Sequence, residues 1–270
     1  MNMTEPLPAC EFYRDILDVL DEAKIPILIG GAFAQEYFTG ISRDTKDLDL
    51  FILESDVRRA LDALQRAGYR PEIKFSHWLA KAYDKDGIEF VDIIFNSGNG
   101  LCKVDRTWFE HAPAGEMFGK PARYCPVEES IWQKAFIMER ERYDGADIAH
   151  LLRAQGDKLD WYRLLRRFGE HWRVLFSCVT LFGYIYPAER TKIPDWLQRH
   201  LADAFSREIG RDVPGEAVCA GTFLSRAQFL VDIQHWGYRD LRAPELMSPQ
   251  ELTEWTAAAE EESKPQRQTG

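Results

Sequence analysis

Asp47 and Asp49 are separated by one residue in KDLDLFIL, a largely apolar run that predicts a strand. Because side chains alternate along a strand, both carboxylates point to one face while Leu48 and Leu50 point into the core. Burying two adjacent carboxylates costs several kcal/mol unless a cation such as the oxygen-seeking Mg²⁺ compensates. Asp92 lies in IEFVDIIF, a strand too apolar for a lone acid to have an obvious structural reason. The three aspartates are therefore candidate metal ligands.

Gly30 and Gly31 follow the apolar run PILI and precede AFAQEYFTG, so they lie where a strand ends and a helix begins. Without side chains there, backbone N–H groups and the helix dipole can approach a phosphate. Each feature alone has an ordinary explanation, since Gly-Gly can be a turn and Asp-x-Asp a solvated strand end. Their order along the chain is more specific: strand, Gly-Gly, helix, strand with Asp-x-Asp, strand with a third Asp.

This order resembles the nucleotidyltransferase superfamily typified by DNA polymerase beta. The superfamily's core motif is Gly-Gly or Gly-Ser, a spacer of about one helix, Asp-x-Asp, and a third Asp on a later strand. The matching residues are Gly30, Gly31, Asp47, Asp49 and Asp92. Within the superfamily, GISRDTKDLDLFI is most similar to the bacterial R-x-T-x-D-[LI]-D group, which includes the AbiE-type toxins and related uncharacterised nucleotidyltransferases. The similar region covers roughly residues 25 to 153.

The same group carries a later helical motif with a Lys, an Arg and a D-x-x-D-[IL] pair. Here QKAFIMERERYDGADIAHLL supplies Lys134, Arg140 or Arg142, Asp144 and Asp147. The resemblance implies that Lys134 contacts the triphosphate as a point charge, and that Asp147, with Asp144 beside it, orients this lysine or the acceptor hydroxyl. The alternative is a solvated helix face with ordinary intrahelical ion pairs.

The resemblance implies transfer of a nucleoside monophosphate from an NTP to a hydroxyl or phosphate acceptor, with release of pyrophosphate. Two Mg²⁺ ions would be held by Asp47, Asp49 and Asp92, and Asp92 would also serve as general base for the acceptor oxygen. Partners would be the NTP and an unknown acceptor: a small molecule such as an aminoglycoside, a protein side chain, or an RNA 3′ end such as that of tRNA. A small antitoxin-like partner protein fits the toxin subgroup.

Four residues are nucleotide-binding candidates on the same basis. Gly30 and Gly31 would hold the β- and γ-phosphates. Arg43 and Thr45, just before the acids, either reach the triphosphate as a guanidinium fork and a hydroxyl or brace the loop. A different class of function is a catalytically inactive NTP sensor or antitoxin-like binding protein. The three mutually repelling acids argue against it, because a binding module has little need to keep them.

The 270 residues carry 34 Lys plus Arg against 44 Asp plus Glu, a net charge of −10 that disfavours a generic polyanion-binding protein. A local cluster of Arg163, Arg166, Arg167 and Arg173 is either an RNA-contacting face or, more ordinarily, a solvated one. The five cysteines form no CxxC pair, the first residues lack a secretory pattern, and no run is long enough to span a bilayer. We expect a cytoplasmic protein without a membrane partner.

The apolar periodicities predict an α+β fold. Residues 1–126 read as helix, strand, helix, strand, helix and a strand pair turned at DKDG, a mixed-sheet, polymerase beta-like nucleotidyltransferase domain. Residues 127–263 read as successive helices, an all-helical domain whose first helix completes the site. The last helix begins with Ser248 as N-cap and Glu251 three residues later. Residues 264–270 are expected to be a flexible tail.

Overall fold

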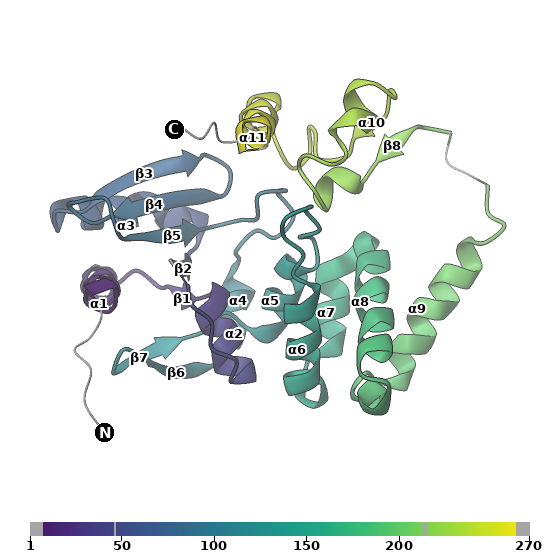
Figure 1. Ribbon diagram of the computed structural model, residues 1–270, viewed down its shortest axis with the longest axis horizontal. Helices are drawn as coiled ribbons and strands as arrows, with labels where there is room; N and C mark the ends of the chain where they lie inside the picture. Colours follow the sequence, from purple (N-terminus) through teal and green to yellow (C-terminus); the bar gives the residue numbers. More distant parts are fainter. Residues whose placement is uncertain (1–7, 46, 213–214, 263–270) are drawn as a thin grey trace, which may run out of the picture. The chain divides into compact units, whose positions relative to one another are not determined.

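The chain forms two compact units in the computed structural model, which describes residues 8–45, 47–212 and 215–262 (Figure 1). Unit 1 comprises residues 1–98 and 103–126, and unit 2 comprises residues 99–102 and 127–270. The predicted tail, residues 264–270, lies outside the described residues. Within the described ranges, no helix has the length and apolar character needed to cross a membrane.

Unit 1 is built on a five-stranded mixed sheet with the order β1-β2-β5-β4-β3. Strands β2 and β5 pair in parallel and the other neighbours pair antiparallel, so the predicted mixed sheet is confirmed. A separate hairpin of β6 and β7 follows. The helices are α1 (Pro8–Glu22), α2 (Gly31–Thr39), α3 (Val57–Arg66) and α4 (Arg106–His111), and the strands are β1 (Leu28–Ile29), β2 (Leu48–Phe51), β3 (Arg70–Phe75), β4 (Leu79–Tyr83), β5 (Phe90–Ile94), β6 (Ala114–Met117) and β7 (Lys120–Arg123).

One face of this sheet is covered by α1 and α3, which pack against each other. Leu48, Leu50, Val91 and Ile93 alternate along β2 and β5 and are buried in that core. Because side chains alternate along a strand, the residues between them project from the opposite face. The hydrophobic pattern therefore fixes which face carries the acids.

Unit 2 is mainly helical, with α8 packed against α6, α7 and α9 (Figure 1). It also contains a short parallel pair of strands, so this unit is not entirely helical as predicted. Its elements are α5 (Val127–Lys134), α6 (Gly145–Gln155), α7 (Trp161–Phe168), α8 (Trp172–Ile185), α9 (Asp195–Glu208), β8 (Val218–Cys219), α10 (Leu230–Gln234), β9 (Arg239–Asp240) and α11 (Pro249–Glu262).

Two stretches that the apolar periodicity predicts as single helices, residues 127–156 and 160–185, are each broken into two helices. Residues 135–144 form a turn between α5 and α6, closed by a bridge between Met138 and Tyr143, because the charged run ERER has no apolar face to bury. Helix α7 ends at Phe168, and its C-cap Gly169 has a φ of 49°, which is open to glycine but strained for other residues. The N-terminus of α11 is as predicted: Ser248 N–H donates to Glu251 Oε2 at 2.9 Å and Glu251 N–H donates to Ser248 Oγ at 3.3 Å.

Candidate active site

Three carboxylates of unit 1 converge on one point. Asp47, Asp49 and Asp92 each offer an oxygen, and these atoms all lie within 4.8 Å of one another. Asp49 and Asp92 are register partners in the parallel pair of β2 and β5, which explains why residues far apart in sequence meet. Each of the three side chains is half-buried. A donor set made only of carboxylate oxygens is the one that Mg²⁺ and similar hard cations prefer, so the residues present fit a divalent metal.

Thr45 holds the first of these acids. Its hydroxyl lies 3.1 Å from the carbonyl oxygen of Asp47 and 3.0 Å from Asp47 Oδ1. This supports the loop-bracing role of Thr45 among the two roles considered from sequence. Arg43, two residues earlier, is exposed. Its reach toward the triphosphate of an NTP stays a prediction.

Gly31 leaves the space in which the Asp49 carboxylate lies. Helix α2 begins at Gly31, with Gly30 as its N-cap, and the Gly30 N–H donates to the carbonyl oxygen of Asp49 at 2.8 Å. Gly31 has a φ of 53°, and a Cβ built on it would lie 1.7 Å from Asp49 Oδ2. A side chain at this position would therefore be strained and would displace a candidate metal ligand. The glycine pair and the acids form one local structure.

Lys81 is a member of this site that the sequence motifs did not indicate. It lies on β4 directly opposite Asp92, and its Nζ is 2.5 Å from Asp92 Oδ1. Burial raises the pKa of the Asp92 carboxyl above its ordinary value; the ammonium of Lys81 opposes that rise and the charge of Asp47 adds to it. The sequence did contain a signal, because Lys81 interrupts the apolar strand LAKAY as Asp92 interrupts IEFVDIIF.

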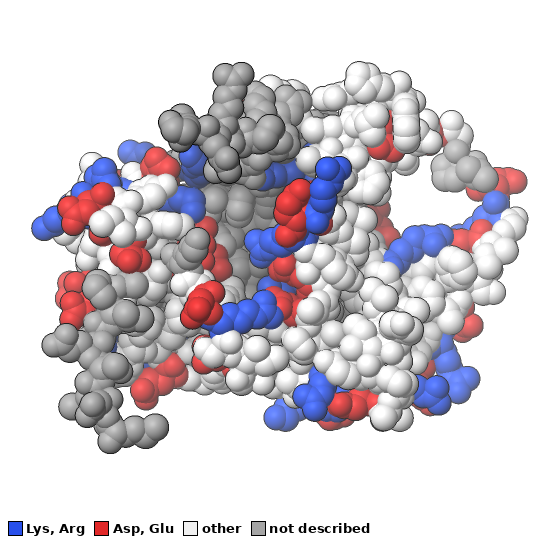
Figure 2. All heavy atoms as spheres, in the orientation of Figure 1, with Lys and Arg blue, Asp and Glu red and all other residues white. Residues whose placement is uncertain are grey.

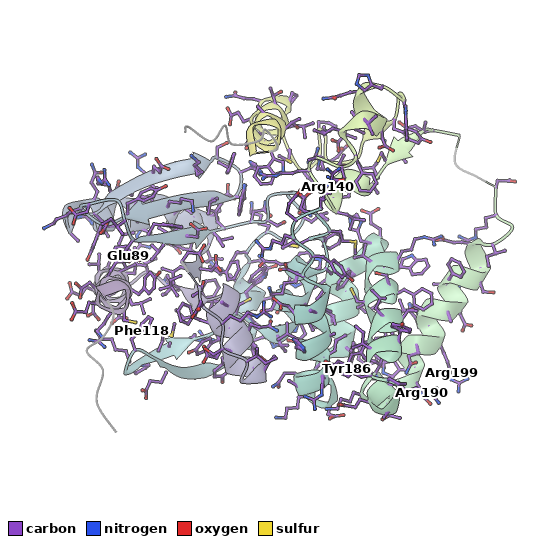
Figure 3. The ribbon with its side chains drawn as sticks, viewed as in Figure 1. Glu89, Phe118, Arg140, Tyr186, Arg190 and Arg199 are labelled. Carbon is purple, nitrogen blue, oxygen red and sulfur yellow. The ribbon has the colours of Figure 1, made fainter. Side chains whose placement is uncertain are left out.

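The negative charge of the site extends toward α1. Tyr13 of α1 is buried and stacks with Phe118, with ring centroids 6.1 Å apart. Burial raises the pKa of Tyr13 to about 12, and the nearby charges of Glu89, Asp47 and Asp49 raise it in the same direction. Glu89 and Phe118 are labelled on either side of α1 in Figure 3. The phenol of Tyr13 thus stays neutral beside these acids.

In unit 2 the predicted Lys134, Asp144 and Asp147 form one buried network. Lys134 Nζ lies 3.0 Å from Asp144 Oδ2 and 2.8 Å from Asp147 Oδ2. Arg142 also donates to Asp144, at 3.0 Å from Nε and 3.1 Å from Nη2. The side chains of Lys134, Asp144 and Asp147 are only 14%, 9% and 9% exposed. They do not form the solvated helix face that was the alternative, because the turn after α5 folds Asp144 back onto Lys134.

The arginine cluster of α7 does not form a continuous basic surface. Arg163 is buried and pairs with Glu128 and Glu129 of α5, and Arg167 Nε lies 3.0 Å from Glu129 Oε1. Arg173 pairs with Glu208. The visible side of the molecule likewise carries acidic side chains beside basic ones (Figure 2). Carboxylates therefore neutralise three of the four arginines that sequence offered as either an RNA-contacting or a solvated face, which a count of basic residues along one helix could not reveal.

Comparison with known proteins gives a family and a set of similar structures. The sequence matches the family described as uncharacterised nucleotidyltransferase over residues 9–178. Among solved structures, the lincosamide antibiotic adenylyltransferase LnuA, lincomycin-bound, is 14% identical with a TM-score of 0.38, over 55% of this chain and 98% of LnuA. ANT(2")-Ia in complex with adenylyl-2"-tobramycin is 19% identical with a TM-score of 0.38, over 74% of this chain and 99% of that one.

A third similar structure is an antigenic nucleotidyltransferase-like protein from Paracoccidioides brasiliensis, 14% identical with a TM-score of 0.37, over 63% of this chain and 91% of that one. Among curated proteins, no match to this sequence is found. The family match covers all three aspartates of the site and the Lys134 network.

Proposed function

This chain belongs to the uncharacterised nucleotidyltransferase family, and from that premise we propose that it transfers a nucleoside monophosphate from an NTP to an acceptor oxygen and releases pyrophosphate. The single observation that carries the proposal is the convergence of Asp47, Asp49 and Asp92 within 4.8 Å in the half-buried surface of a sheet. Such a cluster is unfavourable without a cation. Phosphoryl and nucleotidyl transfer commonly use two Mg²⁺ ions, which are cations of the kind that this cluster requires.

The site residues of unit 1 have separate roles in the proposed reaction. Asp47, Asp49 and Asp92 would hold two Mg²⁺ ions, which would neutralise triphosphate charge and lower the pKa of the acceptor hydroxyl. Asp92 accepts the proton of that hydroxyl while the hydroxyl oxygen forms a bond to the α-phosphorus of the NTP. The bond between the α-phosphorus and the oxygen that bridges it to the β-phosphorus breaks, and pyrophosphate leaves. Gly30 and Gly31 let the start of α2 approach the β- and γ-phosphates.

The Lys134 network has a proposed role in the same reaction. Lys134 contributes a fixed positive charge toward the triphosphate, and Asp144 and Asp147 orient its ammonium. The two carboxylate contacts of Lys134 Nζ, at 3.0 and 2.8 Å, support this role, because a lysine held in one position has few rotamers to lose on binding. We also propose that residues 1–126 and 127–263 are two domains. Arg43 is proposed to contact the NTP.

The acceptor is a small molecule, a protein side chain or an RNA 3′ end. The net charge of −10 and the carboxylate partners of Arg163 and Arg167 favour a small or cationic acceptor over a long RNA. From the R-x-T-x-D-[LI]-D motif we also propose that the chain is related to the bacterial AbiE-type toxins. A small antitoxin-like protein is then a proposed partner.

The test is label transfer from each of four α-labelled NTPs with Mg²⁺, in the presence of total tRNA, an aminoglycoside panel or a protein extract. Wild-type protein is compared with Asp47→Asn/Asp49→Asn and with Asp62→Asn/Asp86→Asn, which removes two acids of the same unit outside the cluster. Label on one acceptor class, lost only in the first variant, supports the proposal and identifies the acceptor. NTP and metal binding without label on any acceptor class contradicts it and favours the inactive sensor.

A further inference from the structure

Lys81, Asp92 and Asp49 form a row across three neighbouring strands. Lys81 on β4 is the register partner of Asp92 on β5, and Asp92 is the register partner of Asp49 on β2. Lys81 Nζ lies 2.5 Å from Asp92 Oδ1. The lysine is thus a cation in direct contact with the acidic cluster, at the position next to its third member.

Two contacts fix the ammonium of Lys81. Besides Asp92, it lies over the ring of Phe90, with Nζ 4.1 Å from the ring centroid. Phe90 and Asp92 are two residues apart on β5 and therefore share a face of the strand. The side chains of Lys81 and Asp92 are only 17% and 14% exposed, so solvent screens this pair less than a surface ion pair.

The formal charge of the cluster shows what the lysine does. Three ionised aspartates bring three negative charges together, and one lysine leaves two of them uncompensated. An ion pair of this kind lowers the repulsion within a metal-free cluster, and it also lowers the attraction of that cluster for a divalent cation. Both effects act on the same carboxylate, Asp92.

We propose that Lys81 is the resident counter-cation of the acidic cluster: it positions the Asp92 carboxylate in the metal-free protein and competes with the divalent metal for it. This inference rests on the proposed function, since it requires Asp47, Asp49 and Asp92 to be a metal site. Lys81 is a positioning residue that sets the metal affinity. A lysine that only braces β4 against β5 would have the opposite effect, because its loss would loosen a ligand and weaken metal binding.

The experiment measures Mn²⁺ binding by titration calorimetry and thermal unfolding without metal, for wild type and Lys81→Met. We expect the variant to unfold at a lower temperature without metal, because the aspartates lose their counter-charge. We expect its Mn²⁺ dissociation constant to fall at least about tenfold, because no ion pair opposes the metal. Lys81→Arg keeps the charge and is expected to retain a dissociation constant near that of wild type.

A matched control is Lys103→Met, which removes a lysine of the same unit that pairs with Glu54 away from the cluster. It has the same change in net charge and is expected to leave Mn²⁺ affinity unchanged. Should Lys81→Met fail to fold, Lys81→Gln carries the same expectation, since it removes the charge and keeps a hydrogen-bond donor.

The outcomes distinguish failure of the role proposed for Lys81 from failure of the proposed function on which that role rests. An unchanged or raised Mn²⁺ dissociation constant in Lys81→Met or Lys81→Gln, with wild type binding the metal, overturns the role of Lys81 and leaves the proposed function standing. Mn²⁺ binding that is absent in wild type, or unaffected by Asp47→Asn/Asp49→Asn, overturns the metal site itself and the inference with it.

Discussion

Replacing Gly31 with alanine tests whether the start of α2 and the acidic cluster are one structure. Gly31 has a φ of 53°, and a Cβ there would lie 1.7 Å from Asp49 Oδ2, at most half of an ordinary contact distance of 3.4–4 Å. The left-handed backbone alone costs an L-residue about 1–2 kcal/mol. The collision adds a second effect, because either the helix start or the Asp49 carboxylate must move. We expect Gly31→Ala to raise the Mn²⁺ dissociation constant at least about tenfold, a free-energy change of about 1.4 kcal/mol.

Gly40, at the other end of α2, separates the two effects. It has a φ of 71°, and a Cβ there would meet nothing within 4 Å. Gly40→Ala therefore carries the backbone strain without the collision. We expect Gly40→Ala to lose about 1–2 kcal/mol in denaturant unfolding and Gly31→Ala at least as much, and only Gly31→Ala to lose metal affinity in calorimetry. Equal metal affinities in Gly31→Ala and Gly40→Ala would refute the reasoning.

Three further predictions concern the buried charges of unit 2. Lys134→Met leaves buried carboxylates without their ammonium and is expected to cost about 3 kcal/mol in denaturant unfolding; a loss under about 0.5 kcal/mol would contradict the network. Burial alone would raise the pKa of Asp144, but hydrogen bonds and charges from Arg142 and Lys134 outweigh it and hold that pKa below the usual 3.8. The contribution of Asp144 to the free energy of unfolding is therefore present above pH 3.8 and is lost as the pH falls through its lower folded-state pKa. Asp144→Asn should flatten the acid limb of a curve of unfolding free energy against pH. An unchanged acid limb would count against this. Glu129→Gln leaves the buried Arg163 short of a counter-charge and should also cost about 3 kcal/mol, whereas a wild-type unfolding midpoint would show that Glu128 suffices.

The residues of the acidic cluster could be predicted from sequence because strand periodicity is a local signal. A period of two puts Asp47 and Asp49 on one face, and an acid in an apolar strand identifies Asp92. Lys81 interrupts its strand in the same way. It was missed because its meaning depends on the register between β4 and β5, and register is set by the turn and by packing across the sheet.

The helical half was less predictable because its breaks depend on tertiary contacts. Periodicity located the apolar stretches of α5 and α6 but not the turn between them, which brings Asp144 back to Lys134. The arginines of α7 looked like one basic face, since the sequence does not show that Glu129 of α5 packs against two of them. The short pair of β8 and β9 has only two residues in each strand, too few for an alternating pattern.

The most direct test of the central claim is the rate of labelled nucleotide transfer in three single variants, Asp47→Asn, Asp49→Asn and Asp92→Asn, beside Asp62→Asn. The assay uses Mg²⁺ and whichever acceptor class takes up label from wild-type protein. If the three aspartates act as one metal site, each single variant loses at least about a hundredfold in rate while Asp62→Asn keeps the wild-type rate. Transfer at the wild-type rate by any one of the three would contradict the account.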